Sequence, residues 1–379
     1  MKVLHVIQSL DPNLGGLPTA LKGLIALENE IQVNHDILSS HSNFEEADFY
    51  NTGFFLFKKS FPKRFNRSKG AIQFLKKNIC EYDLLVVHSV WTLIGYASAK
   101  IAKENNIPYI LWPHGSLDPF DLKKKSILKK LLGPIFIKSL LDYATAICCT
   151  SQKEIEKLET YNSDAAINVL PLPIIIDQIE GSRERFRKKY NYQEGDFVLL
   201  FISRINYKKG LNIIVEGFSR IHEEFPFLKL FIAGSGDKDY LNKLHSWIKF
   251  YNLQNKVIYS GMVLQQEKAD AFLGGDLFVL PSMNENFGLA IFEALYYGLP
   301  VLISKNVYLW QDIVENGGGL ACDYSVESFC EKIKEFLYDR NEYLRMKKKS
   351  TMLAKEYLPT NLASNYKLFY SKILTHNMK

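Results

Sequence analysis

Short apolar runs alternate with longer stretches of helical period along most of the chain. In the first half, the runs that predict strands are Val3–Ser9, Asp36–Ser40, Leu84–His88, Tyr109–Trp112, Ala146–Thr150 and Asn168–Leu172. In the second half they are Phe197–Ser203, Lys229–Ala233, Lys256–Ser260, Leu277–Pro281, Val301–Ser304 and Gly319–Cys322. Continuous apolar runs joined by crossover helices are typical of parallel sheets that are buried on both faces. The pattern therefore predicts an α/β protein with two doubly wound, Rossmann-like parallel sheets.

The length of 379 residues is too great for one ordinary core and favours two domains. A segment from Pro171 to Ser182, with two prolines followed by a polar turn, predicts the hinge. We therefore expect an N-terminal domain over residues 1–172 and a C-terminal domain over residues 173–357. Because doubly wound domains bind ligands at the carboxyl ends of their strands, two such domains predict ligand sites facing a shared cleft.

The composition excludes several classes of protein. A hydrophobic content of 47% argues against disorder, and no apolar run reaches the roughly 20 residues that a membrane-spanning helix needs. The five cysteines are odd in number and lack CxxC spacing, which disfavours both disulfides and a zinc site. We expect a cytoplasmic protein with buried free thiols.

The net charge of +6 is modest, but the positive charge is concentrated in two places. Residues 49–80 contain no acid, and a second basic cluster lies at residues 123–130. The first segment mixes basic and aromatic residues: Phe54, Phe55, Phe57, Lys58, Lys59, Phe61, Lys63, Arg64, Phe65, Arg67, Lys69, Lys76 and Lys77. This mixture suits an anionic membrane surface or single-stranded nucleic acid, or else a solvated face with its phenylalanines turned inward. Because no nucleic-acid-binding signature occurs, we expect no nucleic-acid partner and favour the membrane among the binding functions.

The most informative stretch is PSMNENFGLAIFEALYYGLPVLIS, from Pro281 to Ser304, which holds Glu285 and Glu293. It predicts a buried strand, a turn over residues 284–288 and a helix over residues 289–297. The free N–H groups at a helix N-terminus favour an anion, and a carboxylate accepts hydrogen bonds from sugar hydroxyls. The two carboxylates lie about 12 Å apart along such a helix. That arrangement suits a nucleotide-sugar, in which two sugars flank a diphosphate.

A simpler interpretation is that the two glutamates are solvated surface residues or a helix cap. The neighbouring apolar residues disfavour it, because they are numerous enough to bury most of the helix: Phe287, Leu289, Ile291, Phe292 and Leu295. A glutamate on a buried helix needs a partner.

The whole stretch resembles the donor-binding signature of the family 4 glycosyltransferases, which are retaining enzymes of the GT-B fold. The resemblance implies that Glu285 contacts hydroxyls of the transferred sugar and that Glu293 holds the nucleotide ribose. Backbone groups of Asn286, Phe287, Gly288 and Leu289 would then line the donor. Asn286 stands where the family more often has glycine, and asparagine tolerates a left-handed backbone better than other residues do.

The sequence SRINYKKGL places Arg204 and Lys209 after a strand and before a helix. An arginine fork and a lysine charge can neutralise a diphosphate, although spacing alone also fits a solvent-facing basic loop. The family carries this pair as diphosphate ligands, and the resemblance implies the same here. We expect donor binding without a metal or other cofactor.

Glycine loops follow other strands. Gly15 and Gly16 lie between the first strand and first helix, and no GxGxxG motif supports a dehydrogenase. The resemblance implies that Gly16 lines the diphosphate. Three residues of later strand-end loops, Gly234, Met262 and Val263, are candidates to touch the nucleotide or its sugar. Each of these turns also fits plain loop chemistry.

His114 ends a strand in YILWPHGSLDP, where ligands gather in a parallel-sheet domain. A lone histidine is more often structural, but the family commonly has one here, near the transferred sugar. The resemblance therefore assigns His114 to donor and acceptor positioning. Asp118 is a weaker candidate in the same loop, and His88 is expected to support the loop from behind.

The inferred reaction transfers a hexose, with glucose favoured, from a UDP-sugar to a hydroxyl of a glycan or lipid-linked oligosaccharide acceptor. No second carboxylate is placed as a nucleophile, which favours a same-face route with retention. The resemblance also implies that the C-terminal helix, about 358–379, returns to the first domain. The alternatives are a UDP-sugar epimerase or phosphorylase of similar architecture, and a non-catalytic nucleotide-sugar-binding protein.

Overall fold

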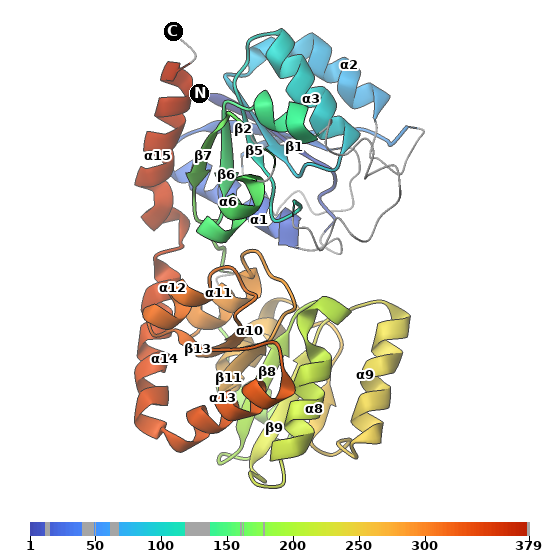
Figure 1. Cartoon of the computed structure of the whole chain (residues 1–379), viewed down its shortest axis with the longest axis vertical. Helices are drawn as coiled ribbons and strands as arrows, with labels where there is room; N and C mark the ends of the chain where they lie inside the picture. Colours follow the sequence, from blue (N-terminus) through green and yellow to red (C-terminus); the bar gives the residue numbers. More distant parts are fainter. Residues whose placement is uncertain are drawn as a thin grey trace. The chain divides into compact units, whose positions relative to one another are not determined.

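The computed structural model describes residues 1–11, 16–39, 49, 51–60, 68–117, 137–159, 161, 163–176 and 179–376. The chain forms two compact units (Figure 1). Unit 1 contains Met1–Ile175 together with Tyr357–Lys379, and unit 2 contains Ile176–Glu356. Each unit is built on a parallel sheet, so the predicted fold class is confirmed.

Unit 1 has a seven-stranded sheet in the order β3-β2-β1-β4-β5-β6-β7. Its strands are β1 (Lys2–Ile7), β2 (Asn34–Ser39), β3 (Thr52–Leu56), β4 (Leu84–His88), β5 (Tyr109–Trp112), β6 (Ala146–Cys149) and β7 (Ala166–Val169). Its described helices are α1 (Gly16–Glu30), α2 (Lys69–Asn78), η4 (Ile79–Glu81), α3 (Leu93–Glu104), α6 (Gln152–Glu159) and α15 (Pro359–His376).

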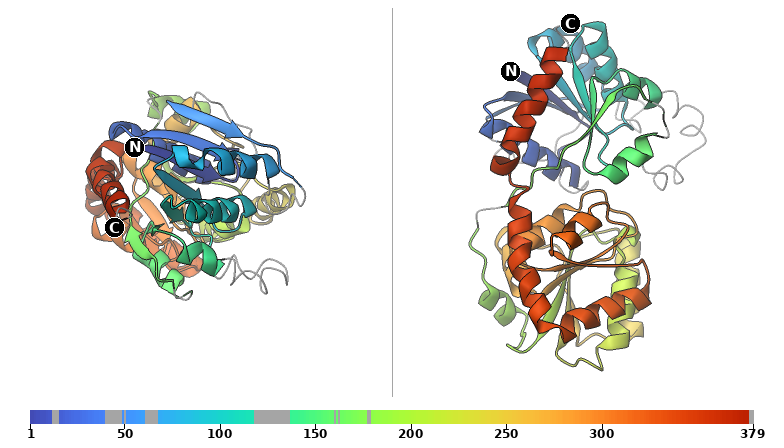
Figure 2. Two further views of the ribbon diagram at one scale, coloured as in Figure 1. Left: turned by 90° about the horizontal axis from the view of Figure 1, so that it is seen from above. Right: turned by 60° about the vertical axis from the view of Figure 1, so that its left-hand side comes forward.

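Alternation along β1 sends side chains to the two faces of this sheet. Leu4 and Val6 join the core with α2 and α3, whereas Ile7 packs with Leu21 and Ile25 of α1. The helix α15 packs against α1 and runs along unit 1 (Figure 2). Residues at both ends of the chain thus share one layer of unit 1.

Unit 2 has a six-stranded sheet in the order β10-β9-β8-β11-β12-β13. Its strands are β8 (Phe197–Ile202), β9 (Leu228–Ala233), β10 (Val257–Tyr259), β11 (Leu277–Leu280), β12 (Val301–Ser304) and β13 (Gly319–Cys322). Its helices are α7 (Arg183–Lys189), η5 (Tyr207–Lys209), α8 (Leu211–Ile221), α9 (Lys238–Phe250), α10 (Gln265–Gly274), α11 (Leu289–Tyr296), α12 (Trp310–Glu315), α13 (Val326–Tyr338) and α14 (Arg340–Lys355).

A buried carboxylate fixes the start of β11 beside β8. Asp276 is 7% exposed, and its Oδ2 accepts hydrogen bonds from Arg187 Nη2 at 2.7 Å and the N–H of Val198 at 2.8 Å. Its Oδ1 accepts from Arg183 Nη2 at 2.8 Å. A buried charge needs such partners, and these three tie α7 to the two central strands of the sheet.

The apolar runs located the strands well, with one omission. The strand β3 falls in the basic aromatic segment, where no strand was predicted, because its two phenylalanines were attributed to a surface. Phe54 packs against the cluster around Ile7, while Phe55 and Phe57 pack against the larger core of unit 1. These three rings are therefore turned inward, as the solvated-face interpretation expects. Phe61, Phe65 and the cluster at 123–130 lie outside the described residues.

Two further sequence-based expectations concern thiols and membrane spans. All five cysteines are free: three of them, Cys148, Cys149 and Cys322, are buried, whereas Cys80 is exposed. Across the described ranges, no helix combines the length and apolar character that crossing a membrane requires.

A substitution at Gly23 can test how tightly α1 packs against the chain at Pro173. A Cβ at this helical position would lie 2.1 Å from the carbonyl oxygen of Pro173. Helix propensity favours alanine by about 1 kcal/mol, but overpacking costs about 1–3 kcal/mol. We expect Gly23→Ala to lower the thermal unfolding midpoint. Gly195→Ala, whose Cβ meets nothing within 4 Å, is the control. A Gly23→Ala protein as stable as the control would contradict the packing described.

Candidate functional site

The loops that follow β8 and β11 meet at the point where the strand order of unit 2 reverses. A Cβ on Gly210, which has φ of 72°, would lie 2.0 Å from the carbonyl oxygen of Pro281. The N–H of Met283 donates to the carbonyl of Lys208 at 2.7 Å. Such reversal points are where doubly wound sheets bind ligands. The close approach brings the basic loop and the acidic turn together.

Glu285 and Lys209, one from each loop, form an ion pair. Their side chains are 17% and 12% exposed, so both charges are largely withdrawn from water. The backbone of Glu285 is held on both sides: its N–H donates to Asn306 at 3.3 Å, and its carbonyl accepts from the N–H of Tyr308 at 2.9 Å. The carboxylate is therefore presented from a fixed backbone.

The turn after Glu285 leads into α11 through Gly288, whose φ is 79°. Phe287 is 4% exposed and stacks on Phe292 at 4.6 Å between ring centroids, which anchors the turn to the helix. The first N–H groups of α11 have no intrahelical acceptor, so they favour an anion. Asn286 does not use its tolerance of a left-handed backbone, because the positive φ of this turn falls on Gly288. The buried Oδ1 of Asn286 has no hydrogen-bond partner within the described part of the chain.

Glu293 also has a cationic partner. Its Oε1 lies 2.6 Å from Lys268 Nζ, on α10, and its side chain is 13% exposed. The sequence predicted that a glutamate on this buried helix needs a partner, but it did not identify Lys268. The two residues are 25 positions apart, and nothing in the local pattern distinguishes Lys268 from the other lysines.

Arg204 follows β8 directly and is exposed. Within the described ranges no hydrogen bond or ion pair holds its guanidinium, so the fork is open to a ligand. Gly234 has φ of 142°, and a Cβ there would lie 1.8 Å from the carbonyl oxygen of Ser203. The loops after β8 and β9 therefore touch at the same edge of the sheet.

The neighbouring loop after β10 is tied to this edge by the N–H of Gly234, which donates to the carbonyl of Gly261 at 2.7 Å. Met262 is 47% exposed and Val263 is 5% exposed. The structure thus places the unit 2 candidates at the carboxyl ends of four adjacent strands, β8 to β11.

His114 and Gly16 belong to unit 1. His114 follows β5 with φ of 50°, and the next N–H, of Gly115, donates to Glu154 Oε1 at 2.6 Å. Glu154 is 3% exposed and also accepts from the N–H of Thr150, at 2.9 Å. No local motif indicated this anchor, since Glu154 lies 39 residues from Gly115.

The supporting role expected for His88 is confirmed, because its Nδ1 lies 2.9 Å from His114 Nε2. Burial lowers the pKa of His114 to about 3. Gly16 is the first residue of α1 and is exposed. Gly15 and Asp118 lie outside the described residues.

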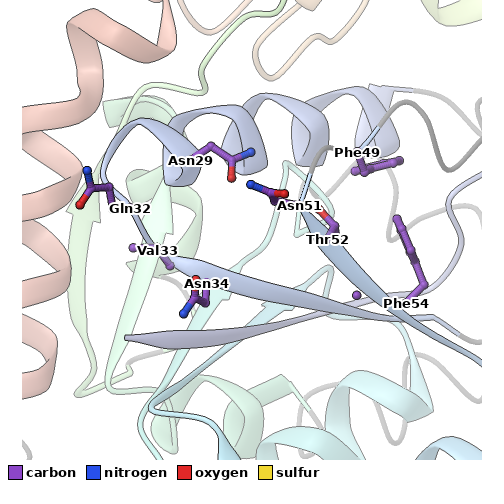
Figure 3. Close-up of a pocket in the computed structure, with 9 residues that line it drawn as sticks. Asn29, Gln32, Val33, Asn34, Phe49, Asn51, Thr52 and Phe54 are labelled. Atoms are coloured by element: carbon purple, nitrogen blue, oxygen red, sulfur yellow. The ribbon is translucent and has the colours of Figure 1, made fainter.

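A hollow of about 820 Å³ lies in unit 1, at the end of its sheet opposite to the carboxyl ends of the strands. Figure 3 shows Asn29, Asn34 and Thr52 around it, beside the amino ends of β2 and β3. None of the nine residues that line it is charged, so it does not suit a diphosphate. Over the described part of the chain no group of three His, Cys, Asp or Glu side chains could hold a metal ion. Donor binding without a metal stays a prediction.

Two family models match consecutive parts of the chain. The model described as "Glycosyltransferase Family 4" matches residues 24–178, and that described as "Glycosyl transferases group 1" matches residues 182–352. The chain belongs to the family 4, group 1 glycosyltransferases. The second match contains Arg204, Lys209, Glu285 and Glu293.

Curated relatives of this glycosyltransferase include alpha-monoglucosyldiacylglycerol synthase of Streptococcus pneumoniae, which is 27% identical over 60% of this chain and 54% of its own length. Mannosylfructose-phosphate synthase of Agrobacterium fabrum is 26% identical over 65% of this chain and 58% of its own length. The matches thus span little more than half of these two relatives. One subunit of the phosphatidylinositol N-acetylglucosaminyltransferase of Homo sapiens is 22% identical over 95% of this chain and 71% of its own length.

Solved structures support the fold. Anabaena HepE in complex with UDP has a TM-score of 0.81 at 17% identity, covering 98% of this chain and 100% of its own. Sucrose-phosphate synthase from Thermosynechococcus elongatus has a TM-score of 0.79 at 16% identity, covering 99% and 100%. The glycosyltransferase has the GT-B fold that the sequence motif implied.

Proposed function

We propose that this glycosyltransferase transfers a hexose from a UDP-sugar to an acceptor hydroxyl with retention of the anomeric configuration. The observation that carries the proposal is the arrangement around the switch point of unit 2. Two glutamates, each beside a lysine, flank a turn that opens a helix N-terminus. Acceptors for sugar hydroxyls thus lie on both sides of donors for a diphosphate.

The diphosphate is held by Arg204, Lys209 and the N–H groups of residues 286–289. Breaking the anomeric C–O bond leaves negative charge on the diphosphate, and fixed donors stabilise that charge as it develops. An arriving phosphate competes with Glu285 for the ammonium of Lys209. Once Lys209 turns to the phosphate, the Glu285 carboxylate is free to accept from hydroxyls of the transferred sugar. No metal is required for this charge balance.

The ribose is held by Glu293. Its carboxylate already faces a cation, Lys268, at 2.6 Å, which holds it in place without ligand. Two ribose hydroxyls donate to the two oxygens of one carboxylate, while Lys268 keeps the electrostatic contact. Gly234, Met262 and Val263 lie at the same strand ends and contact the nucleotide, with Met262 and Val263 near the base.

In unit 1, Gly16 lines the diphosphate and His114 positions the donor sugar and the acceptor hydroxyl. The acceptor proton passes to the departing phosphate oxygen, because no carboxylate is placed as a nucleophile. Glucose is the donor hexose we favour, and two names support it. HepE has also been solved in complex with UDP-glucose, and the pneumococcal relative is named for a monoglucosyl lipid.

The acceptor we propose is a glycan or a lipid-linked oligosaccharide of surface-polysaccharide synthesis. The names of two of the curated relatives contain a lipid, diacylglycerol in one and phosphatidylinositol in the other. A lipid-borne acceptor would bring the basic segment, of which Lys58, Lys76 and Lys77 are exposed, near the inner face of an anionic membrane. Flotation with anionic liposomes at low salt is the measurement that decides this part.

The second candidate is a protein that binds a nucleotide-sugar without transferring it, or a UDP-sugar epimerase of the same fold. The non-catalytic protein predicts loss of a charged group that bond cleavage needs. Arg204, Lys209, Glu285 and Glu293 are all present, which favours transfer.

A donor screen tests the function directly. Purified protein is incubated with UDP-glucose, UDP-galactose, UDP-N-acetylglucosamine and GDP-mannose, and slow hydrolysis of each is followed by release of the nucleoside diphosphate. We expect UDP-glucose to be cleaved fastest. We expect hydrolysis of every donor to be slow, because water reaches the anomeric centre slowly without an acceptor. Cleavage of GDP-mannose alone would refute the UDP-sugar assignment, and cleavage of none would favour the non-catalytic alternative.

Removing the ribose contact should weaken nucleotide binding itself. Glu293→Ala deletes a charged acceptor, and hydrogen bonds to charged groups are worth about 1.5–3 kcal/mol, so we expect UDP to bind about 10- to 100-fold more weakly. Calorimetric titration with UDP measures this change. Glu315→Ala, an exposed glutamate on α12, is the matched control. Equal affinity in both variants would remove the ribose role of Glu293.

Removing a diphosphate ligand should slow turnover more than it destabilises the fold. Arg204→Ala and Lys209→Ala each delete a donor aimed at developing charge, and we expect kcat for UDP-glucose hydrolysis to fall about 100- to 1,000-fold. Thermal unfolding of Arg204→Ala should match that of Arg345→Ala, an exposed arginine on α14. A near-normal kcat in either site variant argues against the diphosphate assignment.

A further inference from the structure

Three histidines form a hydrogen-bonded chain through unit 1 that ends at His114. His114 Nε2 lies 2.9 Å from His88 Nδ1, and His88 Nε2 lies 3.0 Å from His5 Nδ1. The rings stack in sequence, with centroids 5.2 Å and 5.3 Å apart. His5 and His88 are 0% and 1% exposed. The histidine chain therefore runs from the end of β5 into the interior of unit 1.

The register of the sheet explains why these rings meet. His5 of β1 pairs with Val86 of β4, and His88 at the end of β4 pairs with Trp112 at the end of β5. Alternate residues of a strand share a face, so His5, His88 and His114 follow one face diagonally across three strands. That face is the one covered by α1, because the opposite face carries Leu4 and Leu85 in the other core.

A carboxylate closes the inner end of the histidine chain. Glu28, on α1, is 0% exposed, and its oxygens accept from His5 Nε2 at 2.9 Å and from the hydroxyl of Tyr370, on α15, at 2.6 Å. His35 Nδ1 lies 3.3 Å from Oε2. Burial alone would raise the pKa of Glu28, but the facing His5, His35 and Tyr370 lower it to about 2. Glu28 is thus an ionised group that can only accept hydrogen bonds.

An ionised Glu28 restricts where the protons of the histidine chain lie. His5 Nε2 must donate to the carboxylate, so a neutral His5 has an unprotonated Nδ1. That nitrogen needs a donor, which only a protonated His88 Nε2 supplies. His88 Nδ1 is then unprotonated and needs a donor in turn, which is the Nε2–H of His114. With one proton on each ring, a single arrangement satisfies all the bonds.

We propose that Glu28, acting through His5 and His88, fixes His114 in the Nε2–H tautomer, which leaves its Nδ1 as a hydrogen-bond acceptor for a hydroxyl group of the substrate. Glu28, His5 and His88 are positioning residues, and His114 alone meets the substrate. The inference rests on the role of His114 in the proposed function and names the chemistry that His114 recognises. A sugar or acceptor hydroxyl donates to such a nitrogen, whereas a phosphate oxygen does not.

Burial favours the neutral forms of His88 and His114. It lowers the pKa of His88 well below the usual range, with His114 and His5 adding to the effect, and it lowers the pKa of His114 as well. A neutral imidazole exchanges between two tautomers unless its other nitrogen is held, and a fixed partner on that nitrogen selects one. His114 has a positive φ of 50°, a backbone conformation that residues other than glycine seldom adopt and that the surrounding structure must hold.

The tautomer is measured directly by long-range proton–nitrogen correlation spectra of protein labelled with ¹⁵N-histidine, recorded at pH 8. His114→Gln identifies the resonances of His114. We expect a protonated Nε2 and an unprotonated Nδ1 in the wild-type protein. A protonated Nδ1 on His114 would overturn the proposal.

Two substitutions break the histidine chain at different points. His88→Phe keeps a stacked ring but cannot hydrogen-bond, and Glu28→Gln replaces one acceptor oxygen by a donor of similar size. In both, we expect His114 to populate both tautomers. Tyr370→Phe removes a hydrogen bond from Glu28 outside the histidine chain, so His114 should keep the Nε2–H form. If a folded His88→Phe protein still shows a single Nε2–H tautomer of His114, the histidine chain does not select that tautomer. The His88→Phe variant alone decides the question if Glu28→Gln fails to fold.

Kinetics separate this inference from the proposed function. We expect kcat/KM for the UDP-sugar to fall about 10- to 100-fold in His88→Phe, as for other residues that orient a functional histidine. The Kd for UDP should change less than about twofold, because UDP lacks the hydroxyls of the transferred sugar. An unchanged kcat/KM in a variant with mixed tautomers would overturn the substrate role of the histidine chain. Absence of any UDP-sugar cleavage by the wild-type protein would instead refute the proposed function, and the tautomer spectra would still decide the proton arrangement.

Discussion

The candidate donor site of unit 2 depends on the close approach of two loops that follow neighbouring strands. Gly210 packs against the carbonyl oxygen of Pro281 so tightly that no side chain fits between them. This contact joins a loop rich in cations to a turn rich in acceptors, because β8 and β11 are adjacent although they lie about 80 residues apart in the chain. A wider separation of the loops would place Lys209 out of reach of Glu285.

The ion pairs at this site have a consequence for binding. A largely buried carboxylate is stable only beside a compensating charge, and Lys209 and Lys268 supply it to Glu285 and Glu293. The lysines also hold the glutamates oriented before any ligand arrives. In the proposed function, a ligand that brings its own negative charge, such as a diphosphate, takes over Lys209 and leaves Glu285 to bind hydroxyls. A neutral sugar cannot make this exchange, so the proposed site favours sugars that are attached to a phosphate.

The sequence predicted the strands because parallel strands buried on both faces are continuous apolar runs. It missed β3, whose phenylalanines lie next to a run of lysines and look like part of a surface segment. It proposed Arg204, Lys209, Glu285 and Glu293 as candidates, since they lie in local motifs that follow strands. The sequence did not identify Lys268, Glu154 or Glu28, because none of them belongs to a local motif. Each acts on a residue that is distant in sequence, and only the folded chain shows which charge lies beside which partner.

The contribution of the histidine chain to the stability of unit 1 does not explain why these polar residues are buried. Replacing a buried network of charged and polar groups by apolar residues of similar volume is often neutral or stabilising, so a core that contains Glu28, His5 and His88 needs another explanation. Each step from Glu28 to His114 is a hydrogen bond, as the burial of these polar groups requires. The open end of the histidine chain is His114, beside the carboxyl ends of the strands. The network is closed by Glu28 at its buried end and ends at His114, so in the proposed role the order of its protons is set from the interior of unit 1 toward the histidine that accepts from a hydroxyl group.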